Sequence, residues 1–253
     1  MPDRTIFLER MTRPQVETAL ADGFTSVIVP CGSVEQHGPH LPLFTDAEIG
    51  TRLGAEVARR LGSTVVAPTI RVGCSEHHMD FAGSLTLRKS TFVAVCLDYC
   101  TSLARHGFER ILLLPSHGGN FEPLAESVDE FDTAVGASCT VVAFTDLLAI
   151  VTLWKEEVDS MCGLGDRIGG HADIAESSLM LCLHPGLVNQ DAAAEGLLGG
   201  LSQELVERVM SDGMKSVTPT GILGDARGMS EEIGERLIVA SADMIADYFR
   251  ERA

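Results

Sequence analysis

The chain has 253 residues, of which 45% are hydrophobic and 22% are charged, so it has enough apolar content for a substantial core. Its formal net charge of −17 argues against nucleic acid as a partner, because phosphates demand a basic surface, and also against an anionic membrane surface. No run of about 18 apolar residues is present, so we expect no membrane-spanning helix.

The cysteines and the N-terminus bear on the compartment. The seven cysteines include no Cys-x-x-Cys pair, and Met1–Thr5 lacks the basic-then-apolar layout of a signal peptide. We therefore expect a cytoplasmic protein whose thiols are reduced and mostly buried.

Helical patterns and continuously apolar strands alternate along the chain up to residue 144. Strands that are apolar on both sides and alternate with helices predict an α/β fold, with a mostly parallel central sheet and helices on both faces. The predicted helices cover 13–22, 46–61, 92–106 and 122–131, and the predicted strands cover 26–30, 64–68, 110–115 and 140–144.

The remainder of the chain has a weaker pattern. Residues 146–167 end in a glycine-rich passage, and we expect a mobile or partner-contacting segment that helps to cover a site. Residues 221–227 are predicted as a loop and 230–250 as a long amphipathic helix. No internal repeat, low-complexity tract or linker is present, so we expect one domain over residues 1–253.

The loop after the first predicted strand carries the densest group of chemically useful side chains. Glu35 and His37 are two apart, so in extended backbone they point to the same side. Asp46 follows a segment that Pro39 and Pro42 stiffen. A rigid loop with Glu, His and Asp suits a divalent metal ion. The alternative is a polar turn in which Asp46 caps the next helix.

Further polar groups follow the other strands, where functional residues of parallel sheets gather. His77 and His78 lie in a loop that is either a binding loop or simply solvated. His117 begins a His-Gly-Gly-Asn turn, which admits a ligand close to the backbone. No Lys follows those glycines as in a phosphate-binding loop. Asn120 could alternatively cap a helix.

His171 and Glu176 stand near the start of a further predicted helix. The partial positive end of a helix favours a carboxylate or an anionic ligand there. The alternative is an ordinary N-terminal capping arrangement.

Taken together, these groups resemble the creatininase family, the creatinine amidohydrolases and their relatives, which act on amide, formamide and peptide substrates. The resemblance extends from about residue 25 to 240, and its most specific part is the Gly-Ser-x-Glu-Gln-His-Gly-Pro-His-Leu-Pro block. The matching groups are Glu35-x-His37, Asp46, Ser75-Glu76-His77, His117-Gly-Gly-Asn120, His171 with Glu176, and Gly224-Asp225.

The resemblance implies a creatininase-like fold and a pair of divalent ions, Zn²⁺ and/or Mn²⁺. It assigns Glu35, His37, Asp46 and His117 as ligands, with Asp46 bridging the two ions. Glu176 takes the place of the remaining carboxylate ligand, or serves as a catalytic residue.

Two departures argue against creatinine itself as the substrate. Creatininase draws a carboxylate ligand from two positions beyond the last histidine ligand, where this chain has Gly119. It also carries an acidic residue just before the histidine proposed for proton transfer, where this chain has Gly170.

The implied reaction is hydrolysis of a C–N bond. A hydroxide that bridges the metals attacks the carbonyl carbon, and His171 passes a proton to the leaving nitrogen. Ser75, His77 and Asn120 are candidates for orienting the substrate. That substrate is a small-molecule amide, formamide, cyclic amide or short peptide.

Two other functions stay open on the sequence. A binuclear phosphoesterase would need Arg or Lys beside the metals, and only Arg71 and Arg167 are near the motifs in sequence. A non-catalytic, metal-binding family member is the other. By resemblance we also expect a homo-oligomer, since hexamers and other oligomers are usual in the family.

Overall fold

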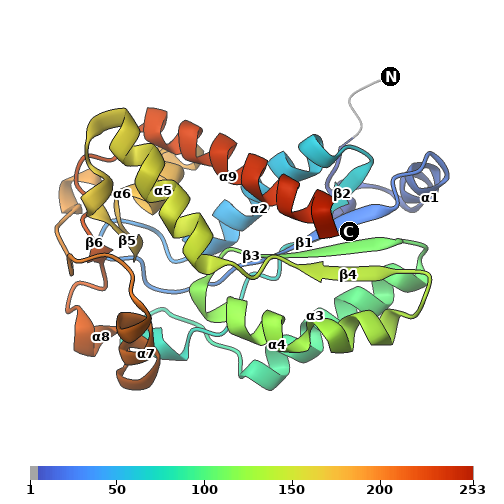
Figure 1. The fold of residues 1–253 in the computed structure, drawn as a ribbon, viewed down its shortest axis with the longest axis horizontal. Coiled ribbons are helices and arrows are strands. Elements are labelled where there is room, and N and C mark those ends of the chain that lie inside the picture. Colours follow the sequence, from blue (N-terminus) through green and yellow to red (C-terminus); the bar gives the residue numbers. More distant parts are fainter. Residues whose placement is uncertain (1–4, 253) are drawn as a thin grey trace.

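Four parallel strands form the central sheet of the computed structural model, which describes residues 5–252. Residues 1–4, on which the signal-peptide expectation depends, lie outside the described residues. The strand order is β2-β1-β3-β4 (Figure 1). The strands are β1 (Ser26–Cys31), β2 (Thr64–Val66), β3 (Arg110–Pro115) and β4 (Thr140–Ala143).

Side chains of these strands pack into two separate hydrophobic cores, because successive residues point to opposite faces of a sheet. Ile28 and Leu112 pack into one core, whereas Val27 and Ile111 pack into the other. Helices cover both faces, which confirms the predicted α/β class (Figure 1). The first face carries α2 (Thr45–Leu61), α5 (Leu147–Cys162), α6 (Ile174–Leu183) and α9 (Glu231–Arg252), and the second carries α3 (Lys89–Arg105) and α4 (Gly118–Val135).

The start of α2 packs directly on the end of β1, and this contact positions Asp46. A Cβ atom on Gly32 would lie 2.5 Å from the Cα of Ala47, so only glycine permits this approach. At the other end, α2 stops at Gly62, which has a φ of +66°. The first turn of α2 is therefore held against the carboxyl edge of the sheet.

The segment 146–167, which we expected to be mobile or partner-contacting, forms helix α5. Asp146 caps it by accepting a hydrogen bond from the amide of Ala149 at 2.9 Å. The Nε1–H of Trp154 donates to Ser241 Oγ of α9 at 2.8 Å. The apolar positions 150, 151, 154 and 158 follow helical spacing and are buried, but the charged residues at 155–157 obscure that pattern in the sequence.

A smaller unit lies beyond the carboxyl ends of the parallel strands (Figure 1, left). It contains the antiparallel pair β5 (Ile168–His171) and β6 (Leu223–Gly224), together with α7 (Gln203–Asp212) and α8 (Met214–Val217). The predicted loop 221–227 thus includes a short strand. The remaining helix, α1 (Arg13–Ala21), precedes β1. Within residues 5–252, no helix combines the length and apolar character that crossing a bilayer requires.

Candidate metal centre

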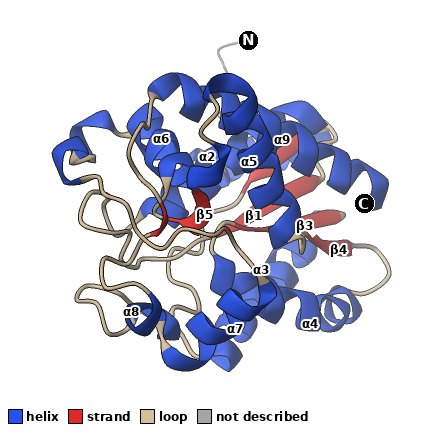
Figure 2. Cartoon of the chain, turned by 60° about the vertical axis from the view of Figure 1, so that its left-hand side comes forward, coloured by secondary structure: helices blue, strands red, loops and turns tan. Residues whose placement is uncertain are grey.

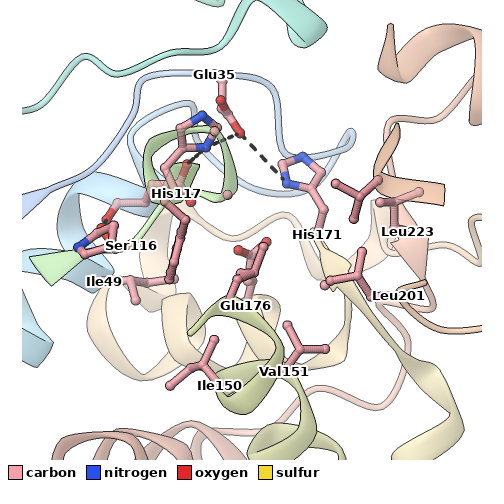
Figure 3. Close-up of a pocket in the computed structure, with 18 of the residues that line it drawn as sticks. Glu35, Ile49, Ser116, His117, Ile150, Val151, His171, Glu176, Leu201 and Leu223 are labelled. Carbon is pink, nitrogen blue, oxygen red and sulfur yellow. Dashed lines mark hydrogen bonds and ion pairs between the residues drawn. The ribbon is translucent and has the colours of Figure 1, made fainter. Parts of the chain in front are cut away.

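The predicted site residues converge at the carboxyl edge of the sheet, where loops gather at one end of the strands (Figure 2). Glu35 and His37 follow β1, and Asp46 lies in the first turn of α2. His117 immediately precedes α4, and Glu176 is in the first turn of α6. All five side chains are buried. Figure 3 shows Glu35, His117 and Glu176 around one pocket.

Asp46 lies between two groups of candidate ligand atoms. In the first group, His117 Nδ1 is 3.2 Å from Asp46 Oδ2 and 3.2 Å from Glu35 Oε1. In the second, His37 Nε2 is 3.1 Å from Asp46 Oδ1 and 3.7 Å from Glu176 Oε2. One carboxylate therefore directs an oxygen to each group, which is the arrangement of a bridging ligand.

The two histidines are held in the tautomer that metal binding needs. His117 Nε2–H donates to the carbonyl oxygen of Cys74 at 3.0 Å. His37 Nδ1–H donates to the carbonyl oxygen of Glu35 at 3.1 Å. A backbone acceptor on one ring nitrogen leaves the other with a free lone pair. Those free nitrogens are the ones that face Asp46.

Two carboxylate oxygens at the centre are buried without a hydrogen bond. They are Glu35 Oε1 and Asp46 Oδ2, both of which belong to the first group of ligand atoms. Their nearest charged or polar partners are imidazole nitrogens: His117 Nδ1 lies 3.2 Å from each oxygen and His78 Nε2 lies 3.2 Å from Glu35 Oε1. Burying carboxylates without well-formed hydrogen bonds is costly, and a cation at this point would offset that cost. Two imidazoles and three carboxylates suit Zn²⁺, and this oxygen-rich set also accepts Mn²⁺. The residues present therefore fit a divalent metal centre.

The electrostatics of these groups are strongly coupled. Burial alone would raise the pKa of Glu35, but His117 and His78 outweigh it and hold that pKa well below its usual range. Burial raises the pKa of Glu176 to about 8. For His37, burial lowers the pKa but the carboxylates of Asp46 and Glu176 more than offset this, and the pKa rises to about 10. Bound cations would displace these protons.

His171 is the last residue of β5 and faces Glu35 across the pocket (Figure 3), with its Nδ1 3.9 Å from Glu35 Oε1. Its Nε2 lies 2.9 Å from the backbone carbonyl oxygen of Gln36 and 2.9 Å from the side-chain nitrogen of Gln36, and the tautomer that donates Nε2–H to the carbonyl leaves Nδ1 as the free nitrogen. Burial, reinforced by the charge of His37, holds its pKa well below the usual 6.5. His171 is therefore neutral at pH 7 and can accept a proton.

The turn between His171 and Glu176 is strained in a way that serves the site. Ala172 adopts a φ of +53°, which is rare for a residue with a side chain. Its amide thereby donates to Glu176 Oε2 at 2.5 Å. The predicted capping role belongs instead to Asp173, which accepts hydrogen bonds from the amides of Ala175 and Glu176. Because Asp173 caps α6, the carboxylate of Glu176 remains free to face His37.

The other capping alternatives are not observed. The side chain of Asp46 is directed at His37 and His117, and Phe44 occupies the capping position of α2 without a side-chain hydrogen bond. Asn120 does not cap α4, because His117 precedes that helix.

Gln36 is a site residue that the sequence reasoning did not single out, and His78 was named there only as one of two histidines in a possible binding loop. The side-chain nitrogen of Gln36 lies within hydrogen-bond distance of Gly221 O at 3.1 Å, His78 Nδ1 at 3.0 Å and His171 Nε2 at 2.9 Å, and in the tautomer described above its two hydrogens are donated to the first two. His78 consequently carries its proton on Nε2, which lies 3.2 Å from Glu35 Oε1. In this tautomer the Nε2–H of His78 is directed at Glu35 and orients it, although Glu35, His78 and His171 also lie close enough together to form a further group of candidate ligands. The alternation Glu35, Gln36, His37 was the available signal.

Asn120 does not face a substrate, contrary to our expectation. Its Oδ1 accepts from the amide of Cys74 at 3.0 Å, and its Nδ2 donates to the carbonyl oxygens of Cys31 and Gly32, each at 3.0 Å. Its exposed fraction is 0%. Asn120 therefore ties together the loops that carry the ligands, and its amide has no free donor for a substrate.

Ser75 also lies behind the centre, whereas His77 lines the pocket. Ser75 Oγ is 2.5 Å from Ser33 Oγ, which donates to Glu35 Oε2 at 3.0 Å. The Nδ1 atom of His77 is buried without a hydrogen-bond partner. Of the three residues predicted to orient a substrate, only His77 lines the pocket and has a side-chain nitrogen without a hydrogen-bond partner.

Gly119 leaves no space for a ligand side chain. A Cβ atom there would lie 2.1 Å from the carbonyl oxygen of Cys74 and 2.6 Å from His117 Nε2. The loop before His77 thus occupies the volume that a carboxylate at this position would need.

The residues that line the pocket include no Lys or Arg. Arg71 pairs instead with Glu48 at 2.9 Å. Arg167 lies 3.7 Å from Asp225 and donates to the carbonyl oxygen of Arg227. The basic groups that a phosphoesterase would need are therefore engaged elsewhere.

Comparison with known proteins agrees with this geometry. A model of the creatininase family, described as creatinine amidohydrolase, matches residues 9–249. The mycofactocin precursor peptide peptidase of Mycobacterium ulcerans is 31% identical, over 88% of this chain and 84% of its own length. Two solved creatininase structures, a variant of Zn-Zn type and a manganese form, are each 26% identical and cover 98% of both chains, with TM-scores of 0.80 and 0.78. The chain therefore belongs to the creatininase family, whose members are metal-dependent amidohydrolases that act on C–N bonds.

Proposed function

We propose that this protein hydrolyses the C–N bond of an uncharged amide, a formamide, a cyclic amide or a short peptide, with two divalent ions at the centre described above. The observation that carries the proposal is the convergence of three buried carboxylates and two imidazoles beside the neutral His171. All of these groups except His37 line a pocket that has no Lys or Arg among its lining residues.

Five side chains would hold the two ions, Zn²⁺ and/or Mn²⁺. Glu35, Asp46 and His117 form one set, and His37, Asp46 and Glu176 form the other. Asp46 belongs to both sets because its two oxygens face opposite groups. When bound, such ions supply a Lewis acid for the carbonyl and lower the pKa of water from ~15.7 to about 7.

His171 moves the proton in this scheme. Its Nδ1 accepts a proton as water attacks and returns it to the leaving nitrogen, which must be protonated to depart. The carbonyl oxygen of Gln36 holds the opposite nitrogen at 2.9 Å and so fixes the ring orientation. His77, with its unpartnered Nδ1, is the candidate for contacting the substrate amide.

Metal content measured beside activity on a substrate panel tests the proposal. The panel holds formamides, short peptides, cyclic amides, creatinine and p-nitrophenyl phosphate. We expect about two ions per chain and turnover of an uncharged amide. Full metal content without turnover of any amide would indicate a non-catalytic protein, and turnover of the phosphate ester alone would indicate a phosphoesterase.

His171→Gln is the matched variant for this test. It removes the proton carrier but leaves the five proposed ligands in place, so it should bind metal normally and lose turnover. Unchanged turnover in that variant would contradict the assigned role of His171.

A further inference from the structure

The pocket is lined partly by polar and mostly by apolar side chains. The metal centre and its histidines form the polar part. The other part, the apolar side, includes residues of α2, α5, α7, α8 and α9; in Figure 3, Ile150 and Val151 lie below Glu176, and Leu201 lies beside His171. Leu53, Phe144, Ile150, Trp154 and Ile245 are among the residues that line this apolar side.

The polar atoms near the apolar side are already satisfied or directed away. The Nε1–H of Trp154 donates to Ser241 Oγ at 2.8 Å, which leaves its ring as the surface offered to a ligand. Ser116 Oγ donates to the carbonyl oxygen of Asp46 at 2.8 Å. Among the lining residues, the charged and imidazole side chains belong to the metal centre or to its histidine neighbours.

This division has an energetic consequence for any bound amide. A polar or charged substituent placed against the apolar side of the pocket, called the apolar wall below, would lose its hydration and gain no hydrogen bond, which is costly. An apolar substituent would gain about 0.8 kcal/mol, or roughly fourfold in affinity, for each methylene group it buries.

We infer that one substituent of the substrate amide is bulky, uncharged and apolar, and binds against this wall. This inference rests on the proposed function for the position of the scissile bond. It excludes small polar amides, creatinine among them, as efficient substrates.

Two valines at the wall allow an isosteric test. Val151 of α5 and Val206 of α7 both line the pocket, and Val→Thr replaces a methyl by a hydroxyl with little change in shape. Val239 of α9 is 44% exposed and does not line the pocket, so Val239→Thr is the matched control.

The binding experiment titrates straight-chain primary amides, from propionamide to octanamide, into the metal-loaded protein by calorimetry. We expect affinity to rise about fourfold per methylene until the wall is covered. Val151→Thr and Val206→Thr should each weaken octanamide binding several-fold, and the control should not. A diamide of matched length, with a second polar end, should bind at least about tenfold more weakly than octanamide.

A flat affinity series, or an equal loss in Val239→Thr, would overturn the inference. Hydrolysis assays on a parallel series of peptide amides distinguish a failure of this inference from a failure of the proposed function. If affinity rises with the chain length of the amide but no amide is hydrolysed, the proposed catalytic function is refuted, and the inferred preference for an apolar ligand is supported. Turnover that ignores apolar bulk would refute the ligand class alone. If Val151→Thr fails to fold, Val206→Thr, which lies in a half-buried position, carries the test.

Discussion

The two sides of the pocket are built on different principles. The metal centre comes from loops that follow the strands and from the first turns of α2 and α6, and backbone hydrogen bonds fix its histidines, as Cys74 does for His117. The apolar wall comes mainly from helices that are far apart in the chain, from α2 to α9, and rests on side-chain packing. Changes in the first should therefore abolish chemistry, whereas changes in the second should redirect specificity.

This contrast matters because the metal centre tolerates little change in the positions of its side chains. Asn120 satisfies three backbone groups of the ligand loops at once, and the Ser33–Ser75 pair supports Glu35 from behind. Fixed ligand geometry of this kind is what preorganised catalysis needs. The following predictions test this contrast and are ordered by the size of the change that we expect.

Asp46→Asn should have the largest effect. It removes the one carboxylate that faces both groups of ligand atoms, so most of the catalytic acceleration, typically at least ~10⁶-fold, should disappear. Activity assays paired with metal analysis measure this. Asp247→Asn, at an exposed position on α9, is the control. Retained activity with full metal content in Asp46→Asn would refute the assignment.

His171→Gln should lower kcat by about 10²–10⁴-fold, the usual contribution of a general acid–base group. Metal content should stay unchanged, because His171 lies outside the two proposed ligand sets. Steady-state kinetics across pH 5–9 provide the measurement. His106→Gln at an exposed site should behave like the parent protein. A change in KM with kcat intact would instead assign His171 to binding.

Gly119→Ala should weaken metal binding by about 10–100-fold, the usual cost of disturbing a partner behind a ligand. Its Cβ would lie 2.1 Å from the carbonyl that orients His117. Gly118→Ala is the matched control, since its Cβ would meet only Leu147 at 4.0 Å. Competition with a chromogenic chelator measures both. Equal affinity in the two variants would show that this close packing is dispensable.

Asn120→Ala should lower the free energy of unfolding by about 2 kcal/mol, because it leaves buried backbone groups unsatisfied. Denaturant titration of the metal-loaded protein measures the change. Asn189→Ala, at an exposed position, should alter stability little. A variant of unchanged stability but lost substrate binding would restore the earlier expectation that Asn120 contacts substrate.

Asp225→Asn should have the smallest effect, about 1 kcal/mol, on stability at pH 7. Burial raises the pKa of Asp225, but hydrogen bonds from Arg227 outweigh it and lower the pKa below its usual 3.8. A group whose pKa is lowered in the folded state stabilises the fold at pH values above its unfolded-state pKa. This stabilisation is lost as the pH falls through the folded-state pKa. The stability difference should therefore shrink between pH 5 and pH 2. A difference independent of pH would remove the ionic explanation.

The sequence alone determined the features that depend on local pattern. The four strands, the placement of Glu35 and His37 on one side of an extended segment, and the position of His117 at a strand end all follow from periodicity and chain breaks. The family resemblance added Glu176, and the comparisons confirmed the family itself.

Only the tertiary structure decided what lies opposite those residues. Asn120 and Ser75 looked like substrate contacts, yet helix and loop packing placed both behind the ligands. Helix α5 had no clear signal, because burial of its apolar positions depends on α9, which begins at residue 231. Local periodicity depends on neighbouring residues alone. The apolar wall of the pocket arises instead from contacts between segments far apart in the chain, and such contacts exist only after the sheet and its helices have packed.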